Sequence, residues 1–236
     1  MKVSEAGEEE AVQEIIYGTG NSAKIAYMKR ALKDIPLLIT GLSEAAEKEG
    51  ILLPQIAETG TTVLENARLK AECYFRLFQR PVFSCDSGLY LWDLDSGLPL
   101  PKEEQPGIHV RRQPEGGMQE QEEGRLTDEQ LLAHHISLVK KHRGPIGARY
   151  QNAICLIWDE KTREESMAED LWGKPFLMTD TPHPKKVEGF PLDRISLDFE
   201  TGKYFYDLGG NSQDSLVSQD GFVSFFRNFM RKNKII

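Results

Sequence analysis

The stretch ETGTTVLENARLKA, residues 58–71, carries the strongest local signal in the chain. Thr62-Val63-Leu64-Glu65 has the spacing of a capping box, in which the threonine oxygen and the glutamate carboxylate satisfy free amide groups at a helix start. The pattern predicts a helix from Thr61 to Gln79. Asn66 and Lys70 are four residues apart, so they are expected on one face of that helix.

Short apolar runs around this helix predict strands, and segments with helical spacing alternate with them. Polar residues 43–57 give no clear preference, and residues 95–126 are rich in Gly, Pro, Glu and Gln, which is typical of a long loop. Mixed strands and helices indicate an α/β or α+β class. Strands are expected at Glu14–Gly18, Pro36–Thr40, Val82–Cys85, Leu89–Leu94, Arg149–Trp158, Ile195–Phe199 and Tyr204–Tyr206, with a strand or hairpin within 163–178, and further helices at Ser22–Lys33, Thr127–His142 and Gln219–Lys232.

Composition excludes several classes of protein. With 236 residues and 39% hydrophobic residues, the chain can bury a sizeable core, and residues 14–236 are expected to form it behind a frayed acidic start at 1–13. A net charge of −8 argues against broad nucleic-acid binding. The apolar runs are too short to cross a bilayer, and no signal peptide is evident, so a cytoplasmic protein without a membrane partner is expected.

The stretch YGTGNSAK, residues 17–24, joins a predicted strand to a predicted helix. Amide groups and the positive end of a helix attract phosphate at such a junction. Gly20 would let the backbone approach a ligand, and Lys24 would add a positive charge. An ordinary strand-to-helix turn also explains these residues and is the commoner case, so the local pattern alone favours the turn while leaving the phosphate site open.

The sequence Cys85-Asp86-Ser87-Gly88 interrupts a predicted strand. A carboxylate at the end of a strand can bind Mg²⁺ or accept a proton from water. Asp-Ser-Gly is also favourable turn chemistry, so Asp86 has a purely structural explanation. The three cysteines and five histidines form no metal-binding spacing, and Cys85 has no histidine nearby that would make it a nucleophile.

In order along the chain, these pieces resemble the inosine/xanthosine triphosphate pyrophosphatase family. Its Thr-Gly-Asn-x-x-Lys loop matches residues 19–24, and its Glu-x-Gly-x-Thr-x-x-Glu-Asn-Ala-x-x-Lys-Ala block matches residues 58–71 in register. Its Asp-Ser-Gly-Leu matches residues 86–89. Looser matches follow at Pro106-Gly107-Ile108, Ala148-Arg149-Tyr150, and Gly189-Phe190 with Asp193. The resemblance spans about residues 14–232.

The resemblance implies an elongated mixed sheet with flanking helices, in two lobes around a central cleft, and a homodimer. It implies that water attacks the α-phosphorus of a nucleoside triphosphate, releasing pyrophosphate with Mg²⁺ as cofactor. The residues carried over are Asp86 and Lys70 for catalysis, Glu58 and Asp86 for the metal, and Thr19, Gly20, Asn21, Lys24, Ser87, Gly88, Phe190, Asp193, Ser218 and Asp220 for substrate.

Several positions depart from the family pattern. Cys85 replaces an acidic residue, and Tyr27 replaces a glutamate. The Ser-His-Arg-Gly motif that reads a 6-oxo purine corresponds to Ser218-Gln219-Asp220-Gly221, where a hydrogen-bond acceptor replaces a donor. Asp220 would suit the N–H edge of guanine. The departures leave two interpretations: a pyrophosphatase of altered base specificity, or a nucleotide-binding or regulatory protein without turnover. The acidic insert at 111–126 has no clear counterpart.

Overall fold

The computed structural model describes residues 12–110, 126–208 and 219–235. Within them lies one seven-stranded mixed sheet of order β2-β1-β3-β4-β6-β7, with β5 also paired to β4. β1 is parallel to both β2 and β3, and the remaining pairs are antiparallel. The strands are β1 (Gln13–Tyr17), β2 (Leu37–Gly41), β3 (Val82–Trp92), β4 (Ile146–Ile157), β5 (Arg163–Ser166), β6 (Phe176–Met178) and β7 (Ser196–Asp198).

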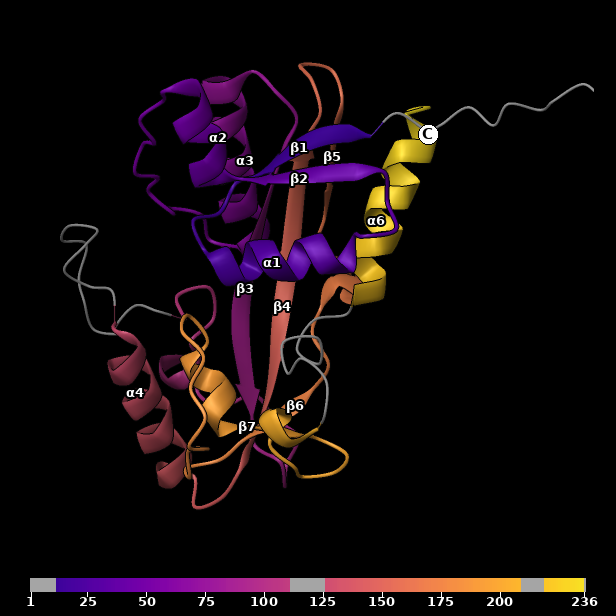
Figure 1. Cartoon of the computed structure of the whole chain (residues 1–236). Helices are drawn as coiled ribbons and strands as arrows, with labels where there is room; N and C mark the ends of the chain where they lie inside the picture. The colour runs from indigo at the N-terminus through magenta and orange to yellow at the C-terminus, as the bar shows by residue number, and fades with distance from the viewer. Residues whose placement is uncertain (1–11, 111–125, 209–218, 236) are drawn as a thin grey trace, which may run out of the picture.

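Strands β3 and β4 form a long ribbon that runs through the whole molecule (Figure 1). Their antiparallel register is unbroken from Val82 opposite Ile157 to Trp92 opposite Gly147. The predicted interruption at Asp86-Ser87-Gly88 is therefore wrong, because pairing along the entire strand overrides the local turn preference of these residues.

Helices cover both faces of the upper part of this ribbon (Figure 1). Helices α1 (Ser22–Ala31) and α6 (Gln219–Lys232) pack over one apolar cluster, whereas α2 (Leu42–Glu49) and α3 (Val63–Phe78) cover two others. The amphipathic α6 is confirmed, with Phe222, Phe226 and Phe229 buried. The lower part is a separate apolar cluster beneath α4 (Asp128–Lys141). In the described ranges, none of the helices has the length and apolar character needed to traverse a bilayer.

Three further expectations require correction. Helix α2 begins at Leu42 and occupies residues 43–49 of the polar stretch 43–57, whose sequence pattern showed no clear preference. Tyr204–Tyr206 is not a strand: Tyr204 makes only an isolated bridge to Leu197, and a 3₁₀ helix, η4 (Phe205–Asp207), follows it. At the start of α3, Thr62 Oγ1 accepts from the Glu65 amide as predicted, but the Glu65 carboxylate accepts mainly from the amide and hydroxyl of Thr61, with a weaker contact to the Thr62 amide.

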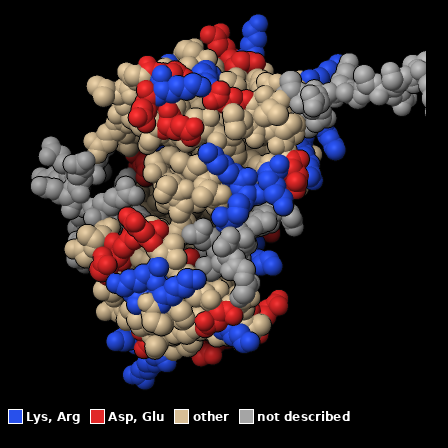
Figure 2. Space-filling view, in the orientation of Figure 1, with Lys and Arg blue, Asp and Glu red and all other residues tan. Residues whose placement is uncertain are grey.

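Surface charge on the face shown is mixed (Figure 2). Lysine and arginine side chains gather over the C-terminal half of α1, whose last turn contains Lys29 and Arg30. Elsewhere on that face, acidic and basic groups alternate. The predicted insert at 111–126 lies outside the described residues, except for Leu126.

Candidate active site

Two carboxylates meet at one lysine in the middle of the molecule. Lys70 Nζ, on α3, lies 2.6 Å from Asp86 Oδ1 on β3 and 3.3 Å from Glu58 Oε1 in the preceding loop. The Lys70 and Asp86 side chains are both largely buried. Burial by itself lowers the pKa of Lys70, but Asp86 and Glu58 outweigh it and leave that pKa above its usual value. The lysine therefore remains protonated and can supply positive charge within the site.

Asn66 ties the loop before α3 to the same strand. Its Oδ1 accepts from the Gly60 amide at 2.9 Å, and its Nδ2 donates to Asp86 Oδ2 at 3.4 Å. Asn66 is almost fully buried, so both bonds are shielded from water. A side chain at Gly60 would collide with Asn66, since a Cβ there would lie 2.6 Å from Oδ1. The amide thus fixes one oxygen of Asp86 while Lys70 holds the other.

Lys24 approaches this group from α1. It is half-buried, and burial lowers the pKa of its ammonium, an effect that repulsion from Lys70 increases. Attraction by Asp86 and Glu58 opposes this lowering of the pKa. The structure therefore brings together four residues singled out from the sequence: Lys24, Glu58, Lys70 and Asp86. We call these four residues, with Asn66, the polar cluster.

The turn from β1 to α1 is capped by its own side chains. Asn21 Oδ1 accepts from the amides of Ala23 and Lys24 at 3.0 and 3.2 Å, and Thr19 Oγ1 accepts from the Asn21 amide at 3.2 Å. Two first-turn amides expected to be free for phosphate are therefore engaged by Asn21 in this structure. Gly20 faces open space, because a Cβ there would meet no atom within 4 Å.

Cys85 precedes Asp86 in β3, but its side chain packs in the apolar core. It is buried, and burial raises the pKa of its thiol to about 12. The thiol is hydrogen-bonded to Tyr17, whose ring stacks on Phe83. A thiol with this pKa remains protonated and is a poor nucleophile. The position at which the family pattern has a carboxylate is thus neutral here.

The strand beyond Asp86 is held by a loop that sequence reasoning missed. Gly107 exchanges two backbone hydrogen bonds of 2.9 Å with Leu89. The side chain of Gln105 binds the amide and carbonyl of Leu91 at 2.9 and 2.6 Å. Gly88 allows this close approach, since a Cβ there would lie 3.1 Å from the Gly107 oxygen. Ser87, the other predicted substrate residue here, is half-buried. A glutamine in an irregular loop gives no periodic signal that would have revealed the clamp.

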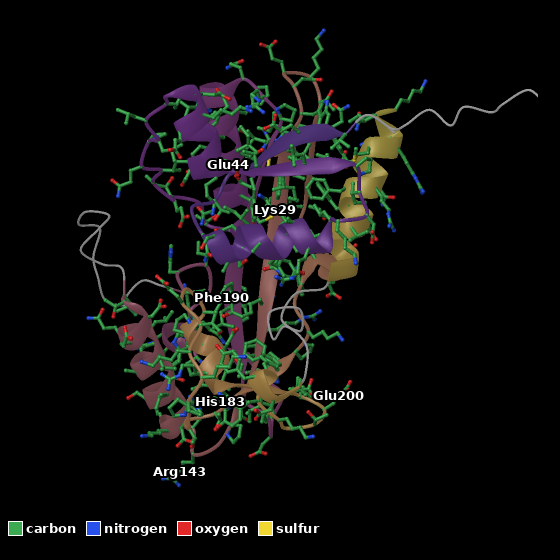
Figure 3. All side chains as sticks on the ribbon, in the orientation of Figure 1. Lys29, Glu44, Arg143, His183, Phe190 and Glu200 are labelled. Carbon is green, nitrogen blue, oxygen red and sulfur yellow. The ribbon has the colours of Figure 1, made fainter. Side chains whose placement is uncertain are left out.

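Residues 189–193 approach the site from the lower part. A Cβ at Gly189 would lie 3.8 Å from Asn21 Nδ2, and the Gly189 amide donates to Asp128 Oδ2 at 3.1 Å. Phe190 lies below the N-terminal end of α1 (Figure 3). This loop therefore borders the β1–α1 turn.

Asp193, in the 3₁₀ helix η3 (Pro191–Ile195), is placed differently from the polar cluster. It is 3% exposed, and burial raises the pKa of its carboxyl to about 7. Its Oδ2 has no hydrogen-bond partner among the described residues, and no described interaction joins it to Lys70 or Asp86. Of the remaining predicted substrate residues, Ser218 lies outside the described residues and the Asp220 side chain is not described.

The carboxylates of Glu58 and Asp86 suit a metal ion whose remaining ligands come from a bound substrate. The described ranges contain no group of three or more His, Cys, Asp or Glu side chains placed to hold a metal. Glu58 and Asp86 nevertheless converge on a single cation, the Lys70 ammonium. Mg²⁺ is commonly held by one or two carboxylates together with substrate phosphates, and these two residues fit that role.

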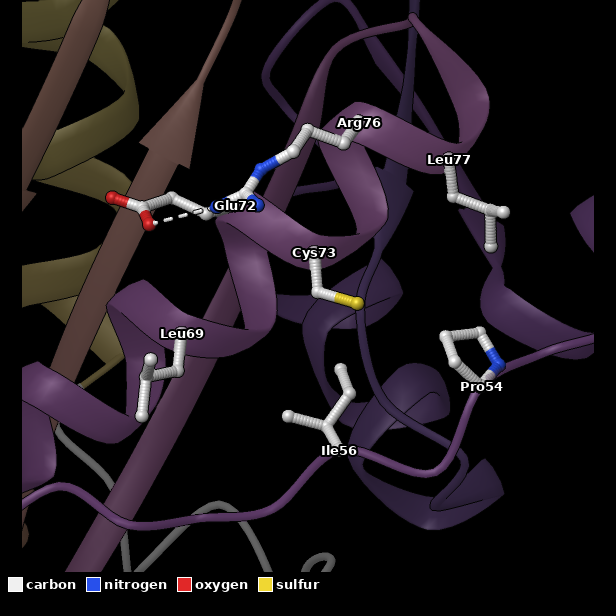
Figure 4. A pocket seen from close by; sticks show the side chains of 7 residues that line it. All are labelled: Pro54, Ile56, Leu69, Glu72, Cys73, Arg76 and Leu77. Carbon is white, nitrogen blue, oxygen red and sulfur yellow. Dashed lines mark hydrogen bonds and ion pairs between the residues drawn. The ribbon is translucent and has the colours of Figure 1, made fainter.

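A hollow of about 470 Å³ lies between α3 and the loop that precedes it (Figure 4). Pro54, Ile56 and Leu77 contribute apolar side chains to its lining, and Cys73 faces it near the ion pair of Glu72 with Arg76. None of its lining residues belongs to the polar cluster. The size of this hollow therefore says nothing about the candidate active site.

Comparison with known proteins agrees with the geometry. The model of the Ham1 family matches residues 15–197. The chain belongs to the Ham1 family. Relatives called dITP/XTP pyrophosphatase include one from Streptococcus pyogenes serotype M1, 39% identical over 86% of this chain and 54% of its own length, and one from Streptococcus mutans, 27% identical over 93% and 58%. The chain thus spans a little over half the length of these relatives.

Solved Ham1 proteins share the fold of this Ham1-family chain. The protein from Coxiella burnetii aligns with a TM-score of 0.64 at 20% identity, covering 93% of this chain and 99% of its own. The protein from Staphylococcus aureus gives 0.61 at 19% identity, covering 94% and 100%. The α/β class with a mixed sheet and flanking helices is confirmed, as is the family to which the sequence was assigned.

Proposed function

We propose that this chain is a Mg²⁺-dependent nucleoside triphosphate pyrophosphatase, which hydrolyses a triphosphate to a monophosphate and pyrophosphate. The observation that carries the proposal is the convergence of Asp86 and Glu58 on Lys70, with Lys24 beside them. A triphosphate brings several negative charges, so its site needs cations and a metal-binding carboxylate pair. The names of the streptococcal relatives support the same activity.

In this proposal the residues of the polar cluster divide the chemistry among them. Asp86 orients a water molecule and accepts its proton as the oxygen attacks the α-phosphorus. Lys24 and Lys70 bind phosphate oxygens and stabilise the negative charge of the departing pyrophosphate. Glu58 and Asp86 would hold Mg²⁺, which when bound neutralises phosphate charge. Asn66 keeps Asp86 oriented through its 3.4 Å hydrogen bond.

We further propose that base preference differs from the family pattern. Asp220 stands where an arginine would donate to a purine carbonyl, and Gln219 stands where a histidine would. An ionised carboxylate can accept from guanine N1 and N2 but cannot donate to O6. Turnover of GTP comparable to or faster than that of ITP is therefore expected. Much faster turnover of ITP would contradict this part of the proposal.

The deciding experiment measures pyrophosphate release from a panel of ribo- and deoxyribonucleoside triphosphates, with Mg²⁺ and with chelator. We expect release with Mg²⁺ only, and a loss of about a hundredfold or more in Lys70→Met. The matched control is Arg76→Met, which removes a positive charge from an exposed position on the same helix. Absence of release from every nucleotide, or equal rates in the two variants, would overturn the proposal.

A second function is favoured by one observation. Cys85 gives β3 a buried neutral thiol next to Asp86, where the family pattern has a further carboxylate. A chain with too few carboxylates would bind nucleotides without hydrolysing them and would act as a regulatory protein. Nucleotide binding without release, unchanged in Cys85→Asp, would favour this alternative. A gain of activity in Cys85→Asp would instead show that the enzyme retains its machinery with reduced metal affinity.

Quaternary structure and domain organisation are also proposed. The sheet runs without a break from β2 to β7, which supports a single domain over residues 14–236. The family resemblance supports a homodimer in the cytoplasm. Light scattering on the purified chain tests the dimer, since a monomeric mass at micromolar concentration would exclude it.

A further inference from the structure

The edge of β3 that faces the β1–α1 turn has a short unpaired section. Above it, the Gly18 amide donates to Phe83 O at 2.8 Å; below it, Leu89 and Gly107 exchange two hydrogen bonds. The chain leaves this edge after Gly18 because the Thr19 amide folds back onto Tyr17 O at 2.7 Å. Alternate residues of a strand direct their backbone groups to the same side. The amides and carbonyls of Cys85 and Ser87 therefore face this gap.

These four backbone groups have no partner among the described residues. On its opposite edge, β3 is paired with β4 along its whole length, so the gap is confined to the side of the β1–α1 turn. Cys85 is buried and Ser87 is half-buried, which makes unsatisfied backbone groups costly. Asp86, which contacts Lys70, lies between them. The unpaired section is thus part of the same site as the polar cluster.

The backbone groups at the gap determine which ligand it can bind. Cys85 and Ser87, two residues apart, each present one N–H donor and one C=O acceptor. A phosphate oxygen only accepts hydrogen bonds and would be repelled by the two carbonyls. A hydroxyl group both donates and accepts, so it can satisfy an amide and a carbonyl together. In a nucleoside triphosphate, the sugar is the hydroxyl-bearing group joined to the α-phosphate, which Asp86 faces in the proposed function.

We propose that the backbone of Cys85 and Ser87 binds the 3′-hydroxyl of the nucleotide sugar. This inference rests on the proposed function, because Asp86 and Lys70 must hold the phosphates beside it. The 3′-hydroxyl is common to ribonucleotides and 2′-deoxyribonucleotides. The gap would therefore position both classes and would reject sugars that lack this group.

The nucleotide test compares kcat/KM for four triphosphates that share the best base of the panel: the ribonucleotide and its 2′-deoxy, 3′-deoxy and 2′,3′-dideoxy forms. Removal of the 3′-hydroxyl should lower kcat/KM about threefold to tenfold, the worth of one net hydrogen bond, whereas removal of the 2′-hydroxyl should change it less. Equal values for the 2′-deoxy and 3′-deoxy forms would overturn the inference. Such a result would leave the pyrophosphatase proposal intact, which fails only if no triphosphate is hydrolysed.

A paired substitution locates the effect on the backbone. Ser87→Pro removes the amide that faces the gap and leaves the β4 side of the ladder without a missing donor. It should abolish the difference between the 2′-deoxy and 3′-deoxy forms. Ser87→Ala retains the amide and should preserve that difference. The same difference in both variants would contradict the assignment.

A spectroscopic measurement covers the case in which Ser87→Pro does not fold. Protein labelled with ¹⁵N-cysteine gives three amide signals, from Cys73, Cys85 and Cys155. The 2′-deoxynucleoside monophosphate should shift the Cys85 signal strongly, and the 2′,3′-dideoxy form should shift it much less. Cys73 on α3 and Cys155 on β4 serve as internal references. A Cys85 signal that does not distinguish the two sugars would overturn the inference.

Discussion

Asn66 Nδ2 lies 3.4 Å from Asp86 Oδ2, while the other oxygen of Asp86 is held by Lys70. A neutral amide and a cation thus share one buried carboxylate. The amide carries no net charge, so it orients Asp86 without neutralising it, whereas Lys70 balances the charge of the carboxylate.

Asn66→Asp should lower kcat/KM. The new carboxylate can still accept from the Gly60 amide, but it places a like charge against Asp86. We expect kcat/KM to fall about tenfold or more, because a neutral donor to Asp86 is replaced by a carboxylate that repels it. Asn228→Asp, which adds the same charge at an exposed position on α6, should leave kcat/KM unchanged. An unaltered kcat/KM in Asn66→Asp would show that the contact does not act on Asp86.

Lys24→Gln should weaken triphosphate binding. The substitution keeps most of the side-chain length but removes a charge that lies near Asp86 and Glu58. We expect KM for the triphosphate to rise about tenfold or more, because charged hydrogen bonds to phosphate are lost. The control is Lys29→Gln on the same helix, where an exposed lysine lies 3.9 Å from Glu44 (Figure 3). Similar KM values for the two variants would exclude Lys24 from the phosphate site.

Gly221→Ala should destabilise the fold. A Cβ at Gly221 would lie 2.0 Å from the backbone oxygen of Asp170, which cannot move as a side chain would. Alanine favours a helix by about 1 kcal/mol over glycine, but the collision should outweigh this gain and lower the free energy of unfolding by about 2 kcal/mol. Urea denaturation measures the change. Gly144→Ala has no atom within 4 Å of its new Cβ and should differ from wild type by about 0.5 kcal/mol or less.

Asp193 should make the protein less stable as the pH rises. Burial raises the pKa of this carboxyl in the folded protein to about 7, from 3.8 in an exposed group. Between these values the folded state binds more protons than the unfolded state, so the free energy of unfolding falls as the pH increases from about 4 to about 7 and levels off above. The full effect is roughly 4 kcal/mol, from a pKa shift of about three units.

Asp193→Asn isolates this contribution, because the amide is similar in shape and does not titrate. Urea denaturation at several pH values should show a difference between variant and wild type that changes steadily from pH 4 to pH 7. The exposed Asp34→Asn variant serves as the comparison. A difference for Asp193→Asn that stays constant across this range would mean that folding does not raise the pKa of Asp193.

Much of the fold could be predicted from the sequence where apolar residues recur at helical spacing or a capping residue marks the start of a helix. Helix α3 was predicted because Thr62 caps it, and α6 because its phenylalanines recur at helical spacing. Helix α2 was missed because two of its three buried residues are alanines, Ala45 and Ala46, which give a weak apolar signal. The continuity of β3 was missed because pairing with β4, a tertiary effect, decided it.

The site was predictable only in part. Helical spacing correctly placed Asn66 and Lys70 on one face, since both contact Asp86. The meeting of Glu58 with Lys70, across a loop, followed from the family resemblance and from no local pattern. The hydrogen bonds of Gln105 to Leu91 join residues far apart in the sequence, and composition and spacing do not reveal them. The unpaired backbone of Ser87 depends on where the neighbouring strand ends, which is also a long-range property.

The continuous β3–β4 ribbon limits how the two parts of the molecule can move. A hinge inside it would break ladder bonds one after another, and at its lower end Gly147 lies so close to Trp92 that a Cβ would come within 2.1 Å of the indole ring. The two ends of the β3–β4 ribbon can therefore rotate against each other only by a slight twist of the ribbon. The separation between the polar cluster above and the residues of η3 below is therefore set at folding, so a ligand bound between them would require little reorganisation of the protein.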